Sequence, residues 1–296
     1  MILTYDFYTV PDFRSAGGLY DSLDPALLTA TPPERFLMGQ DPTFVFDKTL
    51  FMENSLPCLE TNRPFILGTQ DQKWKATLAH RFLELLASKT NKLTRVYTQN
   101  IDGLEGQCAM LPKEKVIPVH GSMDRVACEA CGAEMDFTAF CQEVKTKIKD
   151  ITQMDPDAPA ESSFIKCTKC KKAAVKPTIV LFHSPLPEEF FYSLQSDLTS
   201  GVDLLLVMGT SLSVAPANQI VPLVSETTIR VVMNKEPVGY RLGIDYSESP
   251  ERDFFCKGTC DEVALDLIGE LGWVNDLKAM MNDLPKSNRE LLSTFE

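Results

Sequence analysis

Short apolar runs alternate with amphipathic segments along most of the chain. Leucine and phenylalanine recur at helical spacing between residues 75 and 89, which predicts an amphipathic helix there. The continuous apolar run 203–208 is typical of a buried parallel strand. Further strands are predicted at 95–98, 116–119, 175–182 and 229–233, and further helices at 217–224 and 260–273. Strands that alternate with helices indicate an α/β fold with a mostly parallel sheet.

Three regions depart from this alternation. Residues 1–70 are rich in turn formers and short apolar pieces, and residues 124–175 hold five of the nine cysteines. Between the cysteine pairs, the polar stretch 145–163 predicts a flexible, solvated loop. After about residue 280 we expect a frayed tail, 281–296. The sequence therefore predicts one large α/β domain that carries a small insert.

The composition is that of an ordinary globular protein. Of the 296 residues, 44% are hydrophobic and 24% are charged, which excludes a disordered chain. The 41 acidic residues outnumber the 29 basic ones, for a net charge of -12. This balance suits a basic partner and disfavours direct binding of nucleic acid. It equally disfavours a zinc-ribbon protein that binds nucleic acid.

Nothing in the sequence points to secretion or to a membrane. The first ten residues lack a basic segment and include Asp6, unlike a signal peptide. The best apolar run, 204–208, is far shorter than the roughly 18 residues of a membrane span. We therefore expect an intracellular protein whose cysteines are reduced or bound to metal.

Four cysteines form two close pairs, Cys128-x-x-Cys131 and Cys167-x-x-Cys170. Each pair offers two thiolates from one tight turn, and two such turns make a tetrahedral zinc site. Because four cysteine ligands leave no open position for water, we interpret the site as structural. Four unrelated buried thiols are the alternative, which the paired spacing disfavours. The other five cysteines lack this spacing and are interpreted as packing residues.

A second candidate site follows the buried strand at 204–208. Gly209, Thr210 and Ser211 make a turn of small residues there, which lets backbone N–H groups and hydroxyls approach a phosphate. The next predicted strand ends at Asn234, where a polar side chain can meet a ribose hydroxyl. A tight turn without ligand is an equally good interpretation, because the segment is not a G-x-G-x-x-G loop.

Polar residues also gather where two other predicted strands end. The segment TQNID (98–102) follows one strand, and His120 follows the next. Histidine is the natural general base near neutral pH, so His120 is a candidate catalytic residue, although a structural role remains open. For His80, within the amphipathic helix, a structural role is favoured.

Together these segments resemble the sirtuins, the NAD-dependent protein-lysine deacylases. The matching segments, in the order of the family, are PDFRS (11–15), GLYDSL (18–23), YTQNIDGLE (97–105), VHGS (119–122), the two cysteine pairs, KPTIVLF (176–182), LLLVMGTSLSVAP (204–216) and VVMNKEPVG (231–239). YTQNID and DLLLVMGTSL are most similar to the eukaryotic cytosolic and nuclear branch, which implies a nuclear or cytoplasmic location.

The resemblance implies a fold and a reaction. A Rossmann-type NAD-binding domain would span 1–123 and 175–280, with a small zinc-ribbon domain inserted at 124–174. NAD and an acyl-lysine protein or peptide would meet in the cleft between them, giving nicotinamide, free lysine and O-acyl-ADP-ribose. His120 would be the general base and Asn100 the second catalytic residue. A histone or a tubulin-like protein is a candidate substrate, and protein ADP-ribosylation is a variant of the same chemistry.

The resemblance also implies ligand contacts. Those to NAD are Asp12, Phe13 and Arg14 on a closing loop, Gln99 and Asn100 at the ribose, Ile101 and Asp102 at nicotinamide, Gly209, Thr210 and Ser211 at phosphate, Asn234 and Glu236 at the adenine ribose, and Cys260 near adenine. Those to the acyl-lysine are Val180, Phe182 and Val214.

Two departures from the family pattern affect these expectations. Residues 1–10 contain no glycine where the family has a strand and a glycine-rich loop, and Met1, Leu3 and Thr9 stand at the glycine positions. We therefore expect the first Rossmann strand to be missing and interpret the start as incomplete or alternative. His183-Ser184 replaces Gly-Glu after Phe182, where the histidine would crowd the peptide channel. The alternative function is therefore a catalytically impaired module that binds a peptide or ADP-ribose.

Overall fold

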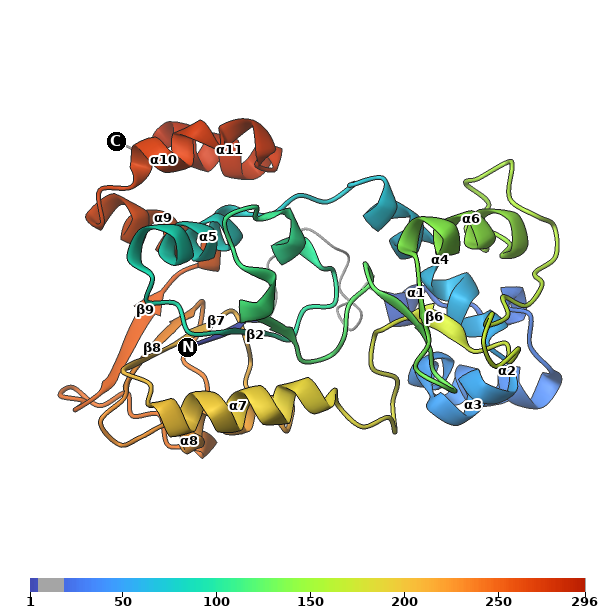
Figure 1. Ribbon diagram of the computed structural model, residues 1–296, viewed down its shortest axis with the longest axis horizontal. Helices are drawn as coiled ribbons and strands as arrows, with labels where there is room; N and C mark the ends of the chain where they lie inside the picture. Colours follow the sequence, from blue (N-terminus) through green and yellow to red (C-terminus); the bar gives the residue numbers. More distant parts are fainter. Residues whose placement is uncertain (5–18, 296) are drawn as a thin grey trace. The chain divides into compact units, whose positions relative to one another are not determined.

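The computed structural model describes residues 1–4 and 19–295 (Figure 1). The chain divides into two compact units. Unit 1 comprises Met1–Thr9, Trp74–His120 and Leu186–Glu296, and unit 2 comprises Val10–Lys73 and Gly121–Pro185. Unit 2 is thus larger than the predicted 124–174 insert, because it also contains a helical segment from before residue 74. No helix of the described residues has the length and apolar character needed to cross a membrane.

Unit 1 is built on a six-stranded parallel sheet. Its strands are β1 (Ile2–Thr4), β2 (Val96–Thr98), β3 (Val116–Pro118), β7 (Leu204–Met208), β8 (Ile229–Asn234) and β9 (Asp253–Lys257). The spatial order is β3-β2-β1-β7-β8-β9, with every pair parallel. Counted along the chain, this is the 3-2-1-4-5-6 order of the Rossmann fold.

The expectation that the first strand is missing is wrong. Ile2 pairs with Val96 of β2 and with Leu206 of β7, so β1 occupies the centre of the sheet. Met1 and Leu3 lie in or beside this strand with buried side chains, so they are not loop positions. Three apolar or β-branched residues suffice, because both neighbouring strands supply hydrogen bonds.

Side chains of the central strands alternate between two apolar cores. Ile2, Val96 and Met208 belong to one core, while Leu3 and Val207 belong to the other. On the first face lie α5 (Leu78–Thr90), α9 (Cys260–Glu270), α10 (Val274–Ala279) and α11 (Lys286–Thr294), and on the other lie α7 (Glu188–Ser200) and α8 (Ile220–Leu223) (Figure 1). Burial on both faces explains why the strands read as continuous apolar runs.

The predicted frayed tail is also wrong for the described residues. The segment after 280 forms α11, and Leu284 and Leu292 are completely buried in the core beneath α5 and α9. The Asn288 side chain accepts the N–H of Leu78 and donates to Asp261, which fixes α11 to the starts of both helices.

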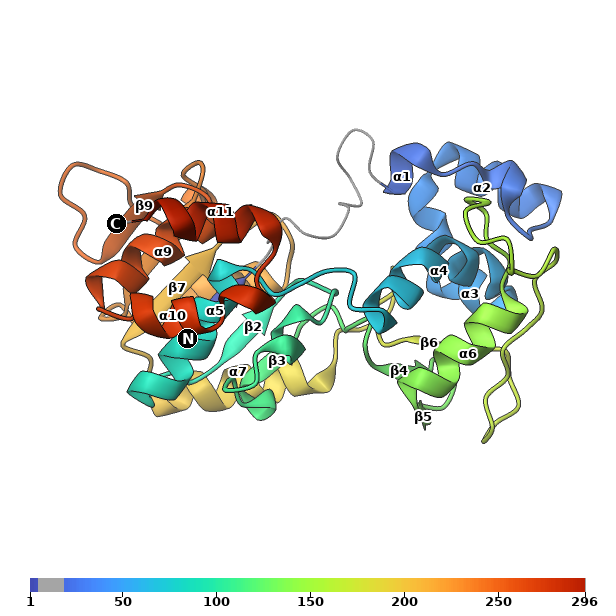
Figure 2. The ribbon, with the colours of Figure 1, turned by 90° about the horizontal axis from the view of Figure 1, so that it is seen from above.

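Unit 2 combines a small antiparallel sheet with helices. Its strands are β4 (Val126–Cys128), β5 (Glu134–Met135) and β6 (Val175–Pro177), in the order β5-β4-β6, and its helices are α1 (Leu19–Ser22), α2 (Pro32–Gln40), α3 (Lys48–Glu53), α4 (Leu56–Gln70) and α6 (Phe137–Lys147). The strand predicted at 175–182 is therefore only three residues long and belongs to this sheet, not to the large one. α4 and α6 lie side by side (Figure 2).

Buried polar side chains of α4 hold the stretch predicted as a solvated loop. The Arg63 guanidinium donates to the Ile148 carbonyl at 2.9 Å and pairs with Asp155 at 2.6 Å. The Ser162 hydroxyl donates to Glu60, which is completely buried. α4 was not predicted, because it carries buried charged residues whose partners lie in segments distant along the chain.

Candidate functional site

The carboxyl ends of four parallel strands bring polar side chains together in unit 1. The Gln99 N–H, just beyond β2, donates to the Thr4 carbonyl of β1 at 2.8 Å. The Thr210 hydroxyl, beyond β7, donates to Gln99 Oε1 at 3.0 Å. The Asn234 amide, at the end of β8, donates to the Thr210 carbonyl at 3.4 Å. This edge includes the β1/β7 boundary, the point where ligands bind in open α/β sheets.

The turn after β7 is shaped by one glycine and two side-chain hydrogen bonds. Gly209 has φ of +67°, a left-handed conformation that residues with a Cβ rarely adopt. The Thr210 hydroxyl accepts the Leu212 N–H at 3.1 Å, and Asn218 donates to the Leu212 carbonyl at 3.0 Å. Ser211 is exposed at the tip, where its hydroxyl contacts that of Ser213 at 2.7 Å. The turn thus places a glycine and two hydroxyl side chains at the edge of the sheet, held by these hydrogen bonds.

Two of these residues were not singled out from the sequence. The Thr4 hydroxyl is completely buried at the end of β1 and has no hydrogen-bond partner within 1–4 and 19–295. Asn218 braces the turn from six residues downstream. Thr4 follows the apolar pair Ile2-Leu3, which is the only local signal, and nothing local marks Asn218.

His120 lies just after β3 with a defined ring orientation. Its Nδ1 is 3.2 Å from the Gln99 carbonyl oxygen. A carbonyl only accepts, so this bond requires the proton on Nδ1 and leaves the lone pair on Nε2. Gly121 follows at φ of +76°, and a Cβ there would overlap the Thr178 carbonyl. The glycine therefore allows the chain just after His120 to pass close to Thr178.

The other residues implied in unit 1 lie around this edge. The Asp102 carboxylate accepts the Leu104 N–H at 3.0 Å, and Ile101 beside it is half-buried. Glu236 is exposed beyond β8. Cys260 begins α9 with its Sγ 3.7 Å from the Met233 carbonyl. The half-buried Val214 follows the Gly209–Ser211 turn, and Asn100 donates its N–H to the Thr98 hydroxyl at 3.2 Å.

The remaining implied residues lie elsewhere. Asp12, Phe13 and Arg14 are outside the described residues. Val180 and Phe182 belong to unit 2, where Val180 is half-buried. The Phe182 N–H donates to the Phe46 carbonyl at 2.9 Å, and its carbonyl accepts the Lys48 N–H at 3.1 Å, while 38% of the residue remains exposed.

His183 stands where the family pattern has a glycine, and its backbone has the conformation that glycine favours. Its φ is +67°, a conformation in which glycine is favoured. Its Nδ1 is 2.7 Å from Asp47 Oδ2, and Asp47 also caps α3 by accepting the Thr49 and Leu50 N–H groups. Burial opposes ionisation of Asp47, but these N–H donors and the His183 ring outweigh it and lower the pKa of the carboxyl. The imidazole is thereby anchored although it is 80% exposed.

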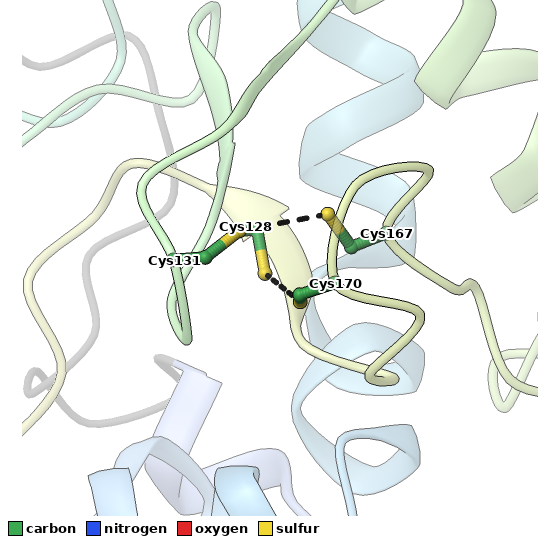
Figure 3. Close-up of side chains that lie close together, drawn as sticks. All are labelled: Cys128, Cys131, Cys167 and Cys170. Carbon is green, nitrogen blue, oxygen red and sulfur yellow. Dashed lines mark hydrogen bonds between the residues drawn. The ribbon is translucent and has the colours of Figure 1, made fainter.

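The four cysteines of the two pairs converge in unit 2 (Figure 3). The Sγ atoms of Cys128 and Cys170 are 3.6 Å apart, those of Cys131 and Cys167 are 3.8 Å apart, and all four lie within 4.8 Å of one another. Four sulfurs at about 2.3 Å from a zinc ion form a tetrahedron with edges of about 3.8 Å. The geometry is therefore compatible with a structural zinc site, as predicted.

The two cysteine turns have the same backbone design. The first cysteine of each pair donates its N–H to the carbonyl five residues further on. Cys128 donates to Ala133 and Cys167 donates to Lys172, both at 2.9 Å. The residue after each pair, Gly132 or Lys171, has positive φ. Backbone N–H groups of Cys170 and Lys169 lower the pKa of Cys167 to about 6, whereas burial raises that of Cys128 to about 12. A cation would stabilise the buried thiolate as well.

The strand order, the polar sheet edge and the four-cysteine cluster define a doubly wound α/β protein with a second, metal-site unit. The sequence matches the Sir2 family model over residues 8–216. The chain therefore belongs to the Sir2 family.

Curated relatives agree with this family. The NAD-dependent deacetylase sir2D of Dictyostelium discoideum is 30% identical over 266 residues, which are 89% of this chain and 42% of that protein. The NAD-dependent protein deacetylase hst2 of Schizosaccharomyces pombe is 31% identical, over 96% of this chain and 74% of that protein. The NAD-dependent histone deacetylase SIR2 of Candida albicans is 34% identical, over 89% and 44%. The chain thus spans less than half the length of two of these relatives.

Proposed function

We propose that this protein is an NAD-dependent protein-lysine deacylase. The observation that carries the proposal is the bond between His120 Nδ1 and the Gln99 carbonyl at the ligand-binding edge of a Rossmann sheet. It turns the basic Nε2 of His120 into an oriented proton acceptor. The names of the relatives, which describe NAD-dependent deacetylases, support the same reaction.

The polar edge of unit 1 suits a dinucleotide. Gly209, Thr210 and Ser211 would bind the pyrophosphate, and the buried Thr4 hydroxyl is an additional donor at the same edge. Gln99 and Asn100 would bind the nicotinamide ribose, Ile101 and Asp102 the nicotinamide, Asn234 and Glu236 the adenine ribose, and Cys260 would lie near adenine. Asp12, Phe13 and Arg14, outside the described residues, would cover the cofactor. When bound, NAD supplies a ribose carbon that exchanges nicotinamide for the acyl oxygen.

His120 would act on a ribose hydroxyl as the general base. Its Nε2 accepts the hydroxyl proton, and the resulting imidazolium is stabilised because Nδ1–H already donates to the Gln99 carbonyl. Gln99 is itself held by Thr210, so the base and the phosphate-binding turn share one support. Asn100, the next residue, would hold the ribose against His120.

The substrate would be an acyl-lysine in a protein or peptide. Val180, Phe182 and Val214 would contact the acyl-lysine side chain. The net charge of -12 suits a basic partner, such as a histone or a tubulin-like protein, in the nucleus or the cytoplasm. The four cysteines would bind zinc in a structural role. Residues 1–123 and 175–280 would form the domain that binds the cofactor, and residues 124–174 the domain that binds zinc.

Nicotinamide release tests the proposal directly. The purified chain, given NAD and an acetyl-lysine peptide, should release nicotinamide in step with peptide deacetylation. His120→Tyr should abolish both while leaving the circular dichroism spectrum and zinc content unchanged. Full activity of the variant would exclude His120 as the base. A folded, zinc-loaded wild-type chain that releases no nicotinamide would favour the impaired binding module.

A further inference from the structure

Glu129 lies between the cysteines of the first pair, in the turn that follows β4. Its backbone N–H donates to the Ala174 carbonyl at 2.7 Å, and its side chain is only 16% exposed. A carboxylate with so little access to water needs donors from the protein. Three side chains supply them, and they come from three separate segments of unit 2.

One donor is Lys176 of β6, whose side chain is 4% exposed. Its Nζ lies 3.2 Å from Glu129 Oε2 and donates to the carbonyls of Ile179 at 2.6 Å and Pro177 at 3.1 Å. An ammonium group has three N–H donors, so these three acceptors use all of them. Lys176 thus ties the chain just after β6 to Glu129, which supplies the opposite charge that a buried ammonium needs.

The other carboxylate oxygen of Glu129 holds the far end of the same stretch of chain. Oε1 accepts the Ser184 hydroxyl at 3.1 Å and lies 3.3 Å from Lys48 Nζ. Lys48 also donates its backbone N–H to the Phe182 carbonyl at 3.1 Å. A single carboxylate therefore contacts both ends of the stretch 176–184, and a segment that pairs with its middle.

We propose that Glu129 is a positioning residue that fixes the stretch 176–184 for an acyl-lysine peptide. This role rests on the proposed function, in which Val180 and Phe182 contact the acyl-lysine side chain. Ser184 suits the arrangement, because its hydroxyl donates to Glu129. The glutamate of the family pattern at this position would instead bring a second carboxylate to the same place, and like charges repel.

Amide hydrogen exchange tests the structural part without any activity. The N–H groups of Phe182 and Ser184 donate to backbone carbonyls at 2.9 and 3.0 Å, so they report on the order of the stretch. We expect Glu129→Gln to raise exchange at positions 182 and 184 about tenfold or more, the effect typical of losing hydrogen bonds to a charged group. Zinc content should stay unchanged.

A second variant keeps this test decisive even if Glu129→Gln does not fold. Ser184→Ala removes one contact and leaves the pair of Glu129 with Lys176 intact, so it should raise exchange at the same two positions by a smaller factor. Wild-type exchange rates in Ser184→Ala and in a folded Glu129→Gln protein would overturn the proposal.

Peptide kinetics test the positioning role. We expect Glu129→Gln to raise KM for an acetyl-lysine peptide about tenfold, with KM for NAD unchanged, because the polar sheet edge proposed for NAD belongs to unit 1. Glu134→Gln removes the same charge from the exposed side of β5 and should change neither constant. Equal rises of both KM values in Glu129→Gln would contradict the role.

A charge-reversal test separates positioning from a general loss of stability. In Ser184→Glu the two carboxylates repel, so KM for the peptide should rise, and it should fall again when Glu129→Gln is added. Full additivity of the two changes would overturn the proposal. A wild-type chain that releases no nicotinamide would instead refute the proposed function, with the exchange rates still deciding whether Glu129 fixes the stretch.

Discussion

The Thr210 hydroxyl donates to Gln99 Oε1 at 3.0 Å and so joins the ends of two strands, β7 and β2, that are not neighbours. β1 lies between them, which makes the two strands about 10 Å apart. The segments that follow β7 and β2 must therefore both bend over the end of β1. It also couples the turn at Gly209 to the carbonyl that orients His120.

Thr210→Val tests this coupling. The isosteric change removes the hydroxyl that serves both Gln99 and the Leu212 N–H, at a site that is 2% exposed. We expect KM for NAD to rise about tenfold, because loss of these bonds costs on the order of 1–2 kcal/mol. Thr199→Val, on the exposed side of α7, is the matched control and should change neither KM nor the melting temperature. An unchanged KM in Thr210→Val would show that the turn is ordered without Gln99.

Cys167→Ser is expected to remove zinc and to unfold the region around β4, β5 and β6. A serine hydroxyl is a poor zinc ligand, and in small metal sites the binding free energy is folding free energy. Zinc content and the thermal unfolding profile measure both effects. Cys141→Ala, at a buried cysteine of α6 outside the cluster, should keep one zinc equivalent. Zinc content and stability equal to wild type in Cys167→Ser would contradict the assignment.

At position 183, glycine is expected to make the protein more stable than alanine does, the reverse of the order within a helix. Both substitutions remove the contact with Asp47, but only glycine relieves the positive φ. His183→Gly should therefore be more stable than His183→Ala by about 1 kcal/mol. At Tyr192, exposed within α7, alanine should be the more stable by a similar amount, about 1 kcal/mol. Urea unfolding measures all four variants, and equal stability of the two His183 variants would rule out backbone strain there.

Burial of His80 predicts a loss of stability in acid. Its pKa is about 3 when folded and 6.5 in the ordinary state, so below pH 6.5 the unfolded chain binds the additional proton. The contribution of His80 to the free energy of unfolding is therefore largest above pH 6.5. It declines as the pH falls toward 3, by up to about 1.4 kcal/mol per pH unit. His80→Gln cannot titrate, so its free energy of unfolding should change less between pH 7 and pH 5. The same pH dependence in both proteins would contradict this prediction.

Features with a local chemical signature were predicted correctly. The two Cys-x-x-Cys pairs indicated a four-cysteine cluster, because each turn is complete within a few residues. The apolar runs at 203–208 and 229–233 indicated parallel strands, because burial on both faces requires such runs. The resemblance to the sirtuins was confirmed by the match to the Sir2 family model. The roles of individual site residues stay predictions.

The incorrect predictions share a different property. β1 was missed because three residues are too few for any periodicity, and its place in the sheet depends on two strands that follow about 90 and 200 residues later. The segment at 175–182 was assigned to the wrong sheet because a short apolar run does not identify its partner strand. The buried charges of α4 have no apolar pattern, and their partners, Thr29 and the segment 148–162, lie about 30 or more residues away along the chain.

The sequence by itself thus determined the fold class, the metal-site cysteines and the candidate base, because local periodicity and ligand spacing carry that information. Only the tertiary structure decided that β1 completes the sheet and that His120 has its proton on Nδ1. The physical reason is that a strand's neighbours and a histidine's tautomer are set by hydrogen-bond partners. These partners lie 21 residues away for His120 and roughly 90 or more for β1.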